Sequence, residues 1–493
     1  MVDTSRMTHA PAPLAIPLHV GSVLKRGFRC AAEGDTAGAL EALAAAAMID
    51  IQQHQQQFLG DVRGCAALAQ CANGWLGGWA AGRAPQPMES RPNSSEPTRV
   101  LYVMPSLAQG HAASANLVRL VDFHMNRSPG KGTIEPAVVI CDEMTARTPK
   151  LPFLSLLDTP SERAGAEHLA KLRALCEVTV LPAQGTFLDA AARGIEAARA
   201  FAPDVAVFTA SPACAVQTAM AAARVAPVQA CLNIGVPLLS RGIDAIIYNN
   251  PLKEARDAEF VRALGIAVTG VLTSGGDAHA GAQVAPFPRQ ELGLPEGVPV
   301  VACMSNVLAR RMLAGTFAAD LVAFLRRNPD VWWLGIGFCD PEPVRAYLRG
   351  LEDGADIARR CVFTGGWSKP WGMIKSCDVV LNEYPEGGGN AVIESMGCGV
   401  PVVAMRAGDR HAEAIGAVLV GPDAIPAPDI AAYWALAERW IRNPAEARAA
   451  GERQRARAQA QLDYAVICPR YEQAILGLAR SAPRAAVPAA ATA

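Results

Sequence analysis

The stretch from residue 378 to residue 404, DVVLNEYPEGGGNAVIESMGCGVPVVA, decides the fold class. It opens with a short apolar run, passes through the consecutive glycines Gly387, Gly388 and Gly389, continues with apolar residues at helical spacing, and closes on a second short apolar run. Short apolar runs without polar alternation are typical of buried parallel strands. The order of strand, glycine loop, helix, turn and strand therefore predicts a parallel α/β unit with a tight loop at the end of its first strand.

The same alternation of apolar runs and helical stretches extends outward in both directions. The strands that it predicts are residues 100–104, 137–141, 178–181, 205–208, 245–248 and 268–272, and then 300–303, 331–336, 362–364, 379–381 and 402–404. A run rich in Gly, Ala and Pro at residues 275–290 separates the two sets and is a plausible hinge. We therefore expect an α/β protein with two Rossmann-like parallel-sheet domains that face each other across a cleft. The N-terminal domain would span residues 99–275 and the C-terminal domain residues 276–440, followed by C-terminal helices at residues 441–480.

Ahead of these domains, residues 19–83 have helical spacing and predict a helical N-terminal segment. Within it, the sequence AAEGDTAGALEAL at residues 31–43 resembles the turn of a tetratricopeptide repeat. A solenoid needs about three repeats to bury a continuous core, so a single unit favours a docked helical cap over a repeat array. Residues 84–98 are rich in Pro, Ser and Asn and predict a linker, and residues 1–18 and 481–493 predict disordered tails.

Composition restricts the classes of partner. The chain has 493 residues, is 51% hydrophobic and has a formal net charge of −1. Because basic and acidic residues are interspersed, we expect no nucleic-acid partner. No run approaches the roughly 20 apolar residues of a membrane span, so we expect no integral membrane segment. The 13 cysteines include no Cys-x-x-Cys pair and no zinc-like spacing. They are interpreted as reduced core residues of a cytoplasmic protein.

The glycine loop carries the strongest chemical signal. Glycines just before a helix let backbone N–H groups and the positive helix N-terminus approach an anion closely, and a diphosphate suits such a site. Glu386 lies at the mouth of the loop and Glu394 about two turns into the helix. Carboxylates accept paired hydrogen bonds from the vicinal hydroxyls of sugars. A bare glycine loop, however, is also compatible with a simple tight turn between strand and helix.

The complete string resembles the donor-binding signature of glycosyltransferases with the GT-B fold, whose retaining branch carries Glu-x7-Glu and a later Val-Pro-Val-Val. The resemblance implies that Glu386 and the following amides contact the donor sugar and that Glu394 binds the ribose hydroxyls of the nucleotide. The Gly-Gly-Gly-Asn string that ends at Asn390 also resembles the protein O-linked N-acetylglucosamine transferases, which invert configuration. Stereochemistry therefore stays open at this point.

The same resemblance implies roles for two further loops of the C-terminal domain. The sequence SNVLAR at residues 305–310 follows the first strand of that domain, where both branches carry a cation for the diphosphate. Arg310 or Arg311 would fill that role, and Asn306 occupies the approximate place of an Arg that the retaining branch usually has. The glycine-tryptophan turn, Gly366 and Trp367, follows the strand at 362–364 and would border the nucleotide base. The two arginines are also compatible with an ordinary solvated loop, and Trp367 is also compatible with a side chain that covers the core.

In the N-terminal domain, the strand at 100–104 runs into a loop that contains Gly110 and His111, and a helix is expected to begin near Ala112. Similar enzymes carry a Gly-rich loop there, often with a His, near the acceptor and the leaving diphosphate. His111 can donate a hydrogen bond or accept a proton. A helix-capping or merely exposed histidine is the alternative. His124, further along that helix, is interpreted as structural.

We therefore expect a glycosyltransferase that moves a sugar from a nucleotide sugar, with UDP favoured, to an acceptor, and that uses neither a metal nor another cofactor. The acceptor, whether glycan, lipid, protein or small molecule, is not readable from the sequence. Two alternatives remain: a nucleotide-sugar epimerase of the same architecture, which needs no acceptor, and a catalytically degenerate scaffold that binds a partner through its N-terminal helices.

Overall fold

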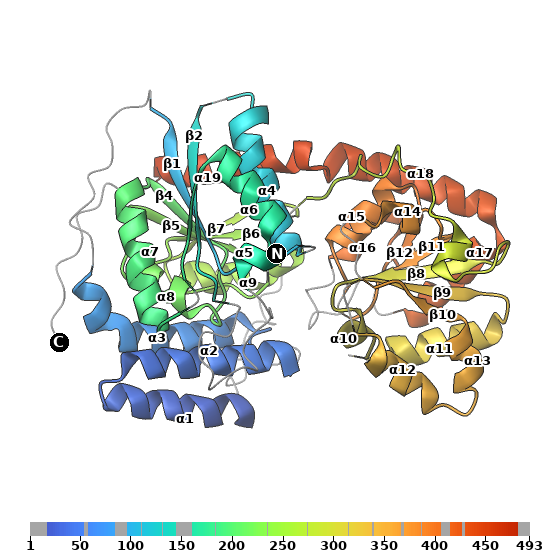
Figure 1. The fold of residues 1–493 in the computed structure, drawn as a ribbon, viewed down its shortest axis with the longest axis horizontal. Coiled ribbons are helices and arrows are strands. Elements are labelled where there is room, and N and C mark those ends of the chain that lie inside the picture. The colour runs from blue at the N-terminus through green and yellow to red at the C-terminus, as the bar shows by residue number, and fades with distance from the viewer. Residues whose placement is uncertain are drawn as a thin grey trace, which may run out of the picture.

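Two α/β lobes stand side by side in a computed structural model of the protein, and a layer of three helices lies beneath the first lobe (Figure 1). The structure describes residues 17–53, 58–83, 96–109, 111–130, 132–143, 160–182, 184–233, 235–273, 275–313, 315–337, 340–365, 369–385, 387–405, 415–425 and 429–481. Most of the two tails and most of the linker expected from the sequence lie outside these ranges, and residues 18 and 481 are already helical.

The N-terminal lobe is built on a seven-stranded parallel sheet with the order β3-β2-β1-β4-β5-β6-β7. Its strands are β1 (Thr98–Met104), β2 (Ile134–Ile140), β3 (Glu177–Val180), β4 (Val205–Phe208), β5 (Val228–Asn233), β6 (Ala245–Tyr248) and β7 (Ala267–Gly270). Its helices are α4 (Ala112–Asp122), α5 (Ser161–Ala164), α6 (Ala166–Leu175), α7 (Phe187–Phe201), α8 (Ala215–Ala222) and α9 (Pro251–Ala263), with a π-helical turn, η1 (Phe123–Arg127), after α4.

The sequence analysis found every strand of this sheet except β5. The reason is Gln229, which interrupts the apolar run yet is fully buried in the structure. Its side-chain amide donates to the carbonyl oxygens of Ala221 and Gly242 at 2.9 and 2.6 Å, and its oxygen accepts from a backbone N–H. A buried polar group is tolerated when its hydrogen bonds are made, so the strand persists without an apolar signature.

The C-terminal lobe has a five-stranded parallel sheet with the order β10-β9-β8-β11-β12. Its strands are β8 (Val300–Met304), β9 (Trp332–Ile336), β10 (Cys361–Phe363), β11 (Val379–Leu381) and β12 (Val402–Val403), all at the expected positions. Its helices are α10 (Leu308–Leu313), α11 (Phe317–Arg327), α12 (Glu342–Arg349), α13 (Gly354–Arg359), α14 (Trp371–Ile374), α15 (Asn390–Gly397), α16 (Gly416–Val420) and α17 (Ile430–Arg442), with 3-10 turns η3 (Arg289–Leu292) and η5 (Gly421–Asp423). The expected fold class, two Rossmann-like parallel sheets, is confirmed.

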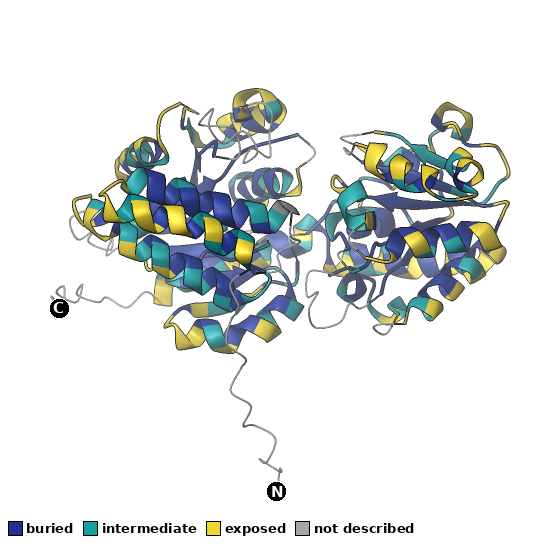
Figure 2. Ribbon diagram, turned by 90° about the horizontal axis from the view of Figure 1, so that it is seen from below, coloured by how far each residue is buried: buried dark blue, intermediate teal, exposed yellow. Residues whose placement is uncertain are grey.

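Each sheet is covered by apolar helices on both faces. Separate hydrophobic clusters fill the two sides of the first sheet and the two sides of the second. Seen from below, both lobes show buried strands at their centres and exposed residues on their outer helices (Figure 2). Tyr433, Trp434, Leu436 and Trp440 of α17 are all buried in the second lobe, as the helical spacing indicated.

The N-terminal helices α1 (Leu18–Ala32), α2 (Thr36–Gln53) and α3 (Val62–Ala81) share a core with the first lobe. Leu40 and Leu43 of α2 and Leu68 of α3 belong to the same buried cluster as residues of α7 and α8. Within this layer, the buried carboxylate of Asp50 accepts backbone hydrogen bonds from Phe58 and Leu59. The segment is thus a docked layer and has no free-standing core of its own.

The chain ends by crossing back from the second lobe to the first. Helix α18 (Pro444–Gln461) packs on the second lobe, and α19 (Tyr464–Ser481) buries its apolar side chains in the first (Figure 1). A buried network fixes α19 there: Glu472 pairs with His124 at 2.9 Å, and the other ring nitrogen of His124 lies 2.8 Å from the Tyr102 hydroxyl. His124 is therefore structural, as expected.

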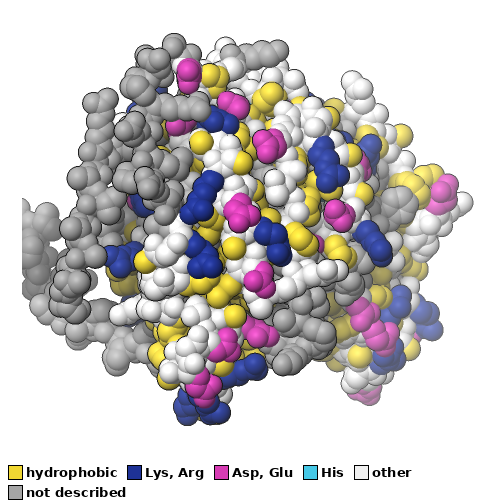
Figure 3. Space-filling model, turned by 60° about the vertical axis from the view of Figure 1, so that its left-hand side comes forward, with side chains coloured by type: hydrophobic (Ala, Val, Ile, Leu, Met, Phe, Trp, Pro, Cys, Tyr) yellow, Lys and Arg dark blue, Asp and Glu magenta, His cyan; other side chains and the backbone are white. Residues whose placement is uncertain are grey.

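Lys and Arg side chains intermingle with Asp and Glu on the face that Figure 3 shows, and apolar side chains are scattered singly between them. Scattered apolar side chains are normal on a protein surface. In the described ranges, no helix combines the length and the apolar character that crossing a membrane requires.

Candidate functional site

The candidate site lies where the two sheets turn their carboxyl ends toward each other. In each sheet the strand order reverses beside the first strand, between β1 and β4 and between β8 and β11. In doubly wound sheets, ligands bind outside the carboxyl ends of the strands at such a switch point. The loops after β1, β8 and β11 are those that the sequence analysis singled out. The topology therefore gathers the candidate residues at one junction between the lobes.

The glycine loop after β11 is held in shape by Asn382. The side-chain amide of Asn382 donates to the carbonyl oxygen of Gly388 at 3.1 Å, and its backbone N–H pairs with Val403. A Cβ atom at Gly387 would overlap the Asn382 side chain. Gly389 then caps α15, which begins at Asn390. The loop thus leaves no room for side chains and ends at a helix N-terminus, the arrangement that favours an anion.

Arg311 faces this loop, and its neighbour Arg310 reaches the N-terminal helical layer. A Cβ atom built on Gly388 would lie 2.9 Å from Nη1 of Arg311, and the same nitrogen donates to Ser305 Oγ at 3.0 Å. Nη1 of Arg310 instead points to the carbonyl oxygen of Ile51 in α2, 3.4 Å away. Of the two arginines left open by the sequence, the structure brings Arg311 to the glycine loop and turns Arg310 toward the N-terminal helical layer.

A carboxylate that the sequence analysis did not select lies beside Arg311. Glu383 follows β11 by two residues and is 2% exposed, and neither carboxylate oxygen has a hydrogen-bond partner among the residues that the structure describes. Burial raises the pKa of Glu383 to about 7, and the charge of Arg311 opposes that shift. Buried carboxylates with raised pKa values concentrate at functional sites. The sequence signal that could have identified Glu383 is its place directly after a buried strand.

Across the junction, helix α15 meets helix α4 of the first lobe. The side-chain amide of Asn390 donates to Asn116 Oδ1 at 3.3 Å, and the Tyr464 hydroxyl donates to the same oxygen at 2.8 Å. Tyr464 opens α19, so three elements from distant parts of the sequence converge on one amide oxygen. The expected donor-binding residue Asn390 is thereby placed at the contact between the lobes.

Glu394 lies one turn further along α15 and is half-buried. Desolvation raises its pKa to about 7, the nearby carboxylate of Asp277 adds to the rise, and Arg119 of α4 opposes it. Asp277 and Arg119 form an ion pair of 3.0 Å that joins the interlobe crossing to α4. The carboxylate of Glu394 therefore sits among groups of both lobes, beside Tyr464.

His111 approaches the junction from the first lobe. It occupies the N-cap position of α4, which begins at Ala112 as expected, but its side chain makes no capping hydrogen bond to the helix backbone. Desolvation of the imidazole, together with the charge of His168, lowers the pKa of His111. His111 is therefore neutral at neutral pH and able to accept a proton.

Four other candidate residues fall in segments that the structure does not describe. Glu386, Gly366, Trp367 and Gly110 lie outside the described residues, so their predicted roles stay predictions. Asn306 is exposed in the turn before α10. No sequence signal pointed to Asn116, Arg119, Asp277 and Tyr464, because only the tertiary fold brings them to α15.

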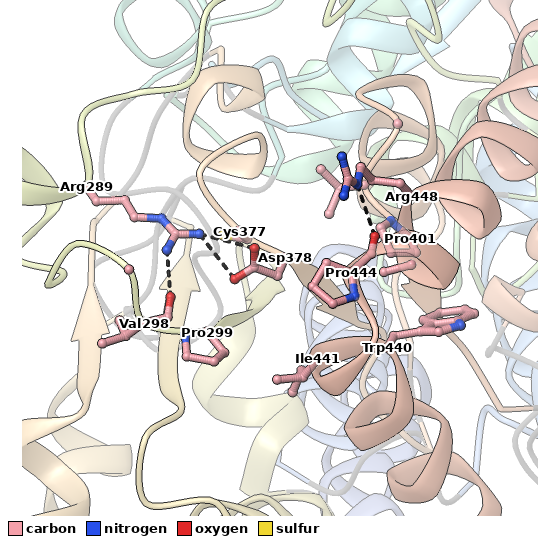
Figure 4. A pocket seen from close by; sticks show the side chains of 14 residues that line it. Arg289, Val298, Pro299, Cys377, Asp378, Pro401, Trp440, Ile441, Pro444 and Arg448 are labelled. Atoms are coloured by element: carbon pink, nitrogen blue, oxygen red, sulfur yellow. Dashed lines mark hydrogen bonds and ion pairs between the residues drawn. The ribbon is translucent and has the colours of Figure 1, made fainter.

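A pocket of about 400 Å³ lies elsewhere, at the amino ends of the strands of the second sheet. Figure 4 shows Arg289 paired with Asp378 on one side and Trp440, Pro444 and Arg448 on the other. Arg289 is already bonded there to Asp378 and to two carbonyl oxygens. The pocket is thus at the opposite edge from the glycine loop. Within the described ranges, no three His, Cys, Asp or Glu residues come together in a group suited to a metal ion.

Sequence comparison identifies the second lobe. The family described as glycosyl transferases group 1 matches residues 298–439. The lipopolysaccharide core biosynthesis glycosyltransferase LpsD of Rhizobium meliloti (strain 1021) is 31% identical over 123 residues, which are 25% of this chain and 34% of that protein. The chain thus spans about a third of the length of this curated relative.

Structural comparison covers both lobes. An O-GlcNAc transferase of Thermobaculum terrenum, solved as a point mutant, has a TM-score of 0.60 at 18% identity and is matched over 94% of this chain and 84% of that one. Anabaena HepE, solved in complex with UDP and glucose, has a TM-score of 0.56 at 17% identity, over 77% of this chain and 100% of that one. Residues 298–439 accordingly match the glycosyl transferase group 1 family, and the chain as a whole has the GT-B fold.

Proposed function

We propose that the protein is a glycosyltransferase that binds a nucleotide sugar between its two lobes and transfers the sugar to an acceptor. The observation that carries the proposal is the arrangement around the glycine loop. One half-buried cation, Arg311, faces a loop without side chains that ends at the N-terminus of α15, and the carboxylate of Glu394 lies further along the same helix. The first pair suits a diphosphate and the carboxylate suits ribose hydroxyls.

The chemistry follows from the charges that develop during transfer. As the bond between the sugar and the diphosphate breaks, negative charge grows on the leaving phosphate. Arg311 and the N–H groups at the start of α15 are fixed before the reaction, so they stabilise this charge without reorganising. These groups supply the stabilisation that a divalent ion provides in other enzymes, and we propose that transfer needs no metal and no further cofactor.

His111 is proposed to act on the acceptor side. Its lowered pKa keeps the imidazole neutral and able to accept the proton that the acceptor hydroxyl loses. Its position before α4 places it on the first lobe, opposite the lobe that holds the glycine loop.

UDP is the favoured nucleotide. Anabaena HepE was solved in complex with UDP and with UDP-glucose, and that likeness supports testing UDP first. The acceptor is proposed only as a hydroxyl-bearing molecule. A cytoplasmic location is proposed because every cysteine among the described residues is a free thiol, as expected in a reducing compartment.

Calorimetric titration with UDP, GDP, ADP and dTDP, in EDTA and then in magnesium, tests the proposal. We expect one nucleotide to bind equally well in both conditions. Removing a charge-assisted hydrogen bond costs about 1.5 to 3 kcal/mol, so Glu394→Ala should bind that nucleotide roughly tenfold to 150-fold more weakly. If no nucleoside diphosphate binds the wild type, the proposed function is wrong, and the alternative of a catalytically degenerate scaffold is favoured.

A further inference from the structure

Glu383 has no role in the donor binding proposed for Arg311, the glycine loop and Glu394, yet its environment is unusual. Its carboxylate is buried in the loop between β11 and the glycines, and in the described part of the chain neither oxygen has a hydrogen-bond partner. A buried ionised carboxylate without hydrogen bonds is costly. A residue of this kind, next to a binding loop, calls for an explanation beyond packing.

Strand register shows which side of the sheet Glu383 faces. Strands β11 and β8 pair with Val379 opposite Val301 and Val380 opposite Ala302. Continuing this parallel register places Glu383 opposite Ser305. Because side chains alternate along a strand, Glu383 and Ser305 share a face. Ser305 is the residue whose hydroxyl accepts from Arg311.

The charged and titratable groups around Glu383 come from three elements. Arg311 reaches it from α10, the Cys303 thiol from β8 and the Tyr433 hydroxyl from α17. Burial raises the pKa values of both Cys303 and Tyr433, so these two groups stay neutral near pH 7. Arg311 is thus the charge that holds Glu383 in its ionised form, and the same guanidinium faces Gly388.

We propose that Glu383 is a positioning residue that holds Arg311 at the glycine loop and takes up a proton from solvent when a diphosphate binds there. The inference rests on the proposed function, since it assigns the diphosphate of the donor to Arg311. When the diphosphate approaches Arg311, its negative charge offsets the cation that had stabilised the carboxylate. In a low-dielectric site the carboxylate then accepts a proton and becomes a neutral acid, and donor binding is linked to pH.

The pKa of about 7 for Glu383 sets the conditions for a test. At pH 7.5 the free protein holds this carboxyl about three-quarters ionised, so binding should be accompanied by the uptake of roughly half to three-quarters of a proton. The terminal phosphate of UDP has a pKa of about 6, as phosphate monoesters do, and is itself already ionised at that pH.

The experiment is calorimetric titration of the full-length protein with UDP, or with whichever diphosphate of the panel binds, at pH 7.5 in Hepes and in Tris. The difference in heat between buffers of different ionisation enthalpy gives the protons exchanged. We expect uptake by the wild type and by the control Glu291→Gln, which alters an exposed carboxylate of the same lobe. Glu383→Gln should take up about half a proton less than the wild type, or lower still, because the Glu394 carboxyl of the same site keeps its own proton equilibrium. Wild-type affinity should also fall by up to about tenfold from pH 7.5 to 8.5, and that of Glu383→Gln should change much less.

The outcomes separate the inference from the proposed function. UDP binding without proton uptake by the wild type, or with equal uptake by Glu383→Gln, overturns the inference and leaves the proposed function standing. Failure of the wild type to bind any nucleoside diphosphate overturns both. If Glu383→Gln does not fold, proton uptake by Glu394→Gln decides the matter, because that variant keeps the Glu383 carboxyl and removes the other carboxyl of the site with a pKa of about 7. Uptake by Glu394→Gln supports the inference, and its absence overturns it.

Discussion

Two adjacent arginines provide a matched test of the donor site. Arg311→Ala removes the guanidinium that faces Gly388, whereas Arg310→Ala removes one that reaches Ile51 of α2 at 3.4 Å. Both substitutions remove one positive charge from the same short helix, so a general change in electrostatic attraction affects the two variants alike. A difference between them therefore reports on the direction of the side chain.

The magnitude follows from the bonds that Arg311 can make. Its Nη1 donates a hydrogen bond to Ser305, and its Nε has no partner within the described ranges. Hydrogen bonds between charged groups are worth about 1.5 to 3 kcal/mol each, so losing one such bond to a diphosphate weakens binding roughly tenfold to 150-fold. Ser305 keeps its bond to the backbone N–H of Val307, and the loop should keep its shape.

Isothermal titration with UDP in EDTA measures this difference. We expect Arg311→Ala to lose at least about tenfold in affinity. Arg310→Ala should stay within about twofold of the wild type, because a substitution away from a ligand changes little at the ligand itself. Its melting temperature should fall slightly as the contact with α2 is lost. Equal losses in the two variants, or a larger loss in Arg310→Ala, would refute the assignment of Arg311 to the diphosphate.

Three further predictions concern the loop, the crossing helix and pH. Gly388→Ala places a Cβ atom 2.9 Å from Nη1 of Arg311, so UDP affinity measured by calorimetry should fall by about tenfold while the melting temperature barely changes. Glu472→Ala leaves Nδ1 of His124 and the Ser128 hydroxyl without their carboxylate partner and should lower the free energy of unfolding in urea by about 2 kcal/mol, with UDP affinity unchanged. The folded protein holds the proton of Glu383 more tightly than the unfolded chain, because burial raises its pKa from 4.5 to about 7. As pH rises from 4.5 through 7, ionisation of this residue therefore lowers the free energy of unfolding of the wild type by roughly 3 kcal/mol. Between pH 5 and 8 the melting temperature of Glu383→Gln should fall less than that of the wild type.

Much of the fold was predictable because buried parallel strands leave a strong local signal. The runs at residues 205–208, 245–248 and 379–381 coincide with β4, β6 and β11, since a strand covered on both faces needs apolar residues throughout. Strand β5 was missed because it contains Gln229. The buried side chain of Gln229 is stabilised by hydrogen bonds to the carbonyl oxygens of Ala221 and Gly242, which the sequence does not show to be neighbours.

The candidate site was predictable only up to the loop that carries each residue. Successive residues on a helix point about 100° apart, so Arg310 and Arg311 lie on different sides of α10, and their sequence does not say which side faces the glycines. Tyr464 illustrates a different limit. It reaches Asn116 only because the chain crosses back between the lobes after α18, and no spacing in the sequence encodes that contact.

The central claim is that a nucleotide binds between the lobes at the carboxyl ends of both sheets, and hydrogen–deuterium exchange in the presence of saturating UDP tests it most directly. The account predicts slower exchange both in residues 382–397 of the second lobe and in the loop and helix after β1, which reach Asp122. Protection confined to the amino-end pocket of Figure 4, at residues 297–299 and 399–401, or no protection in either lobe, would contradict it.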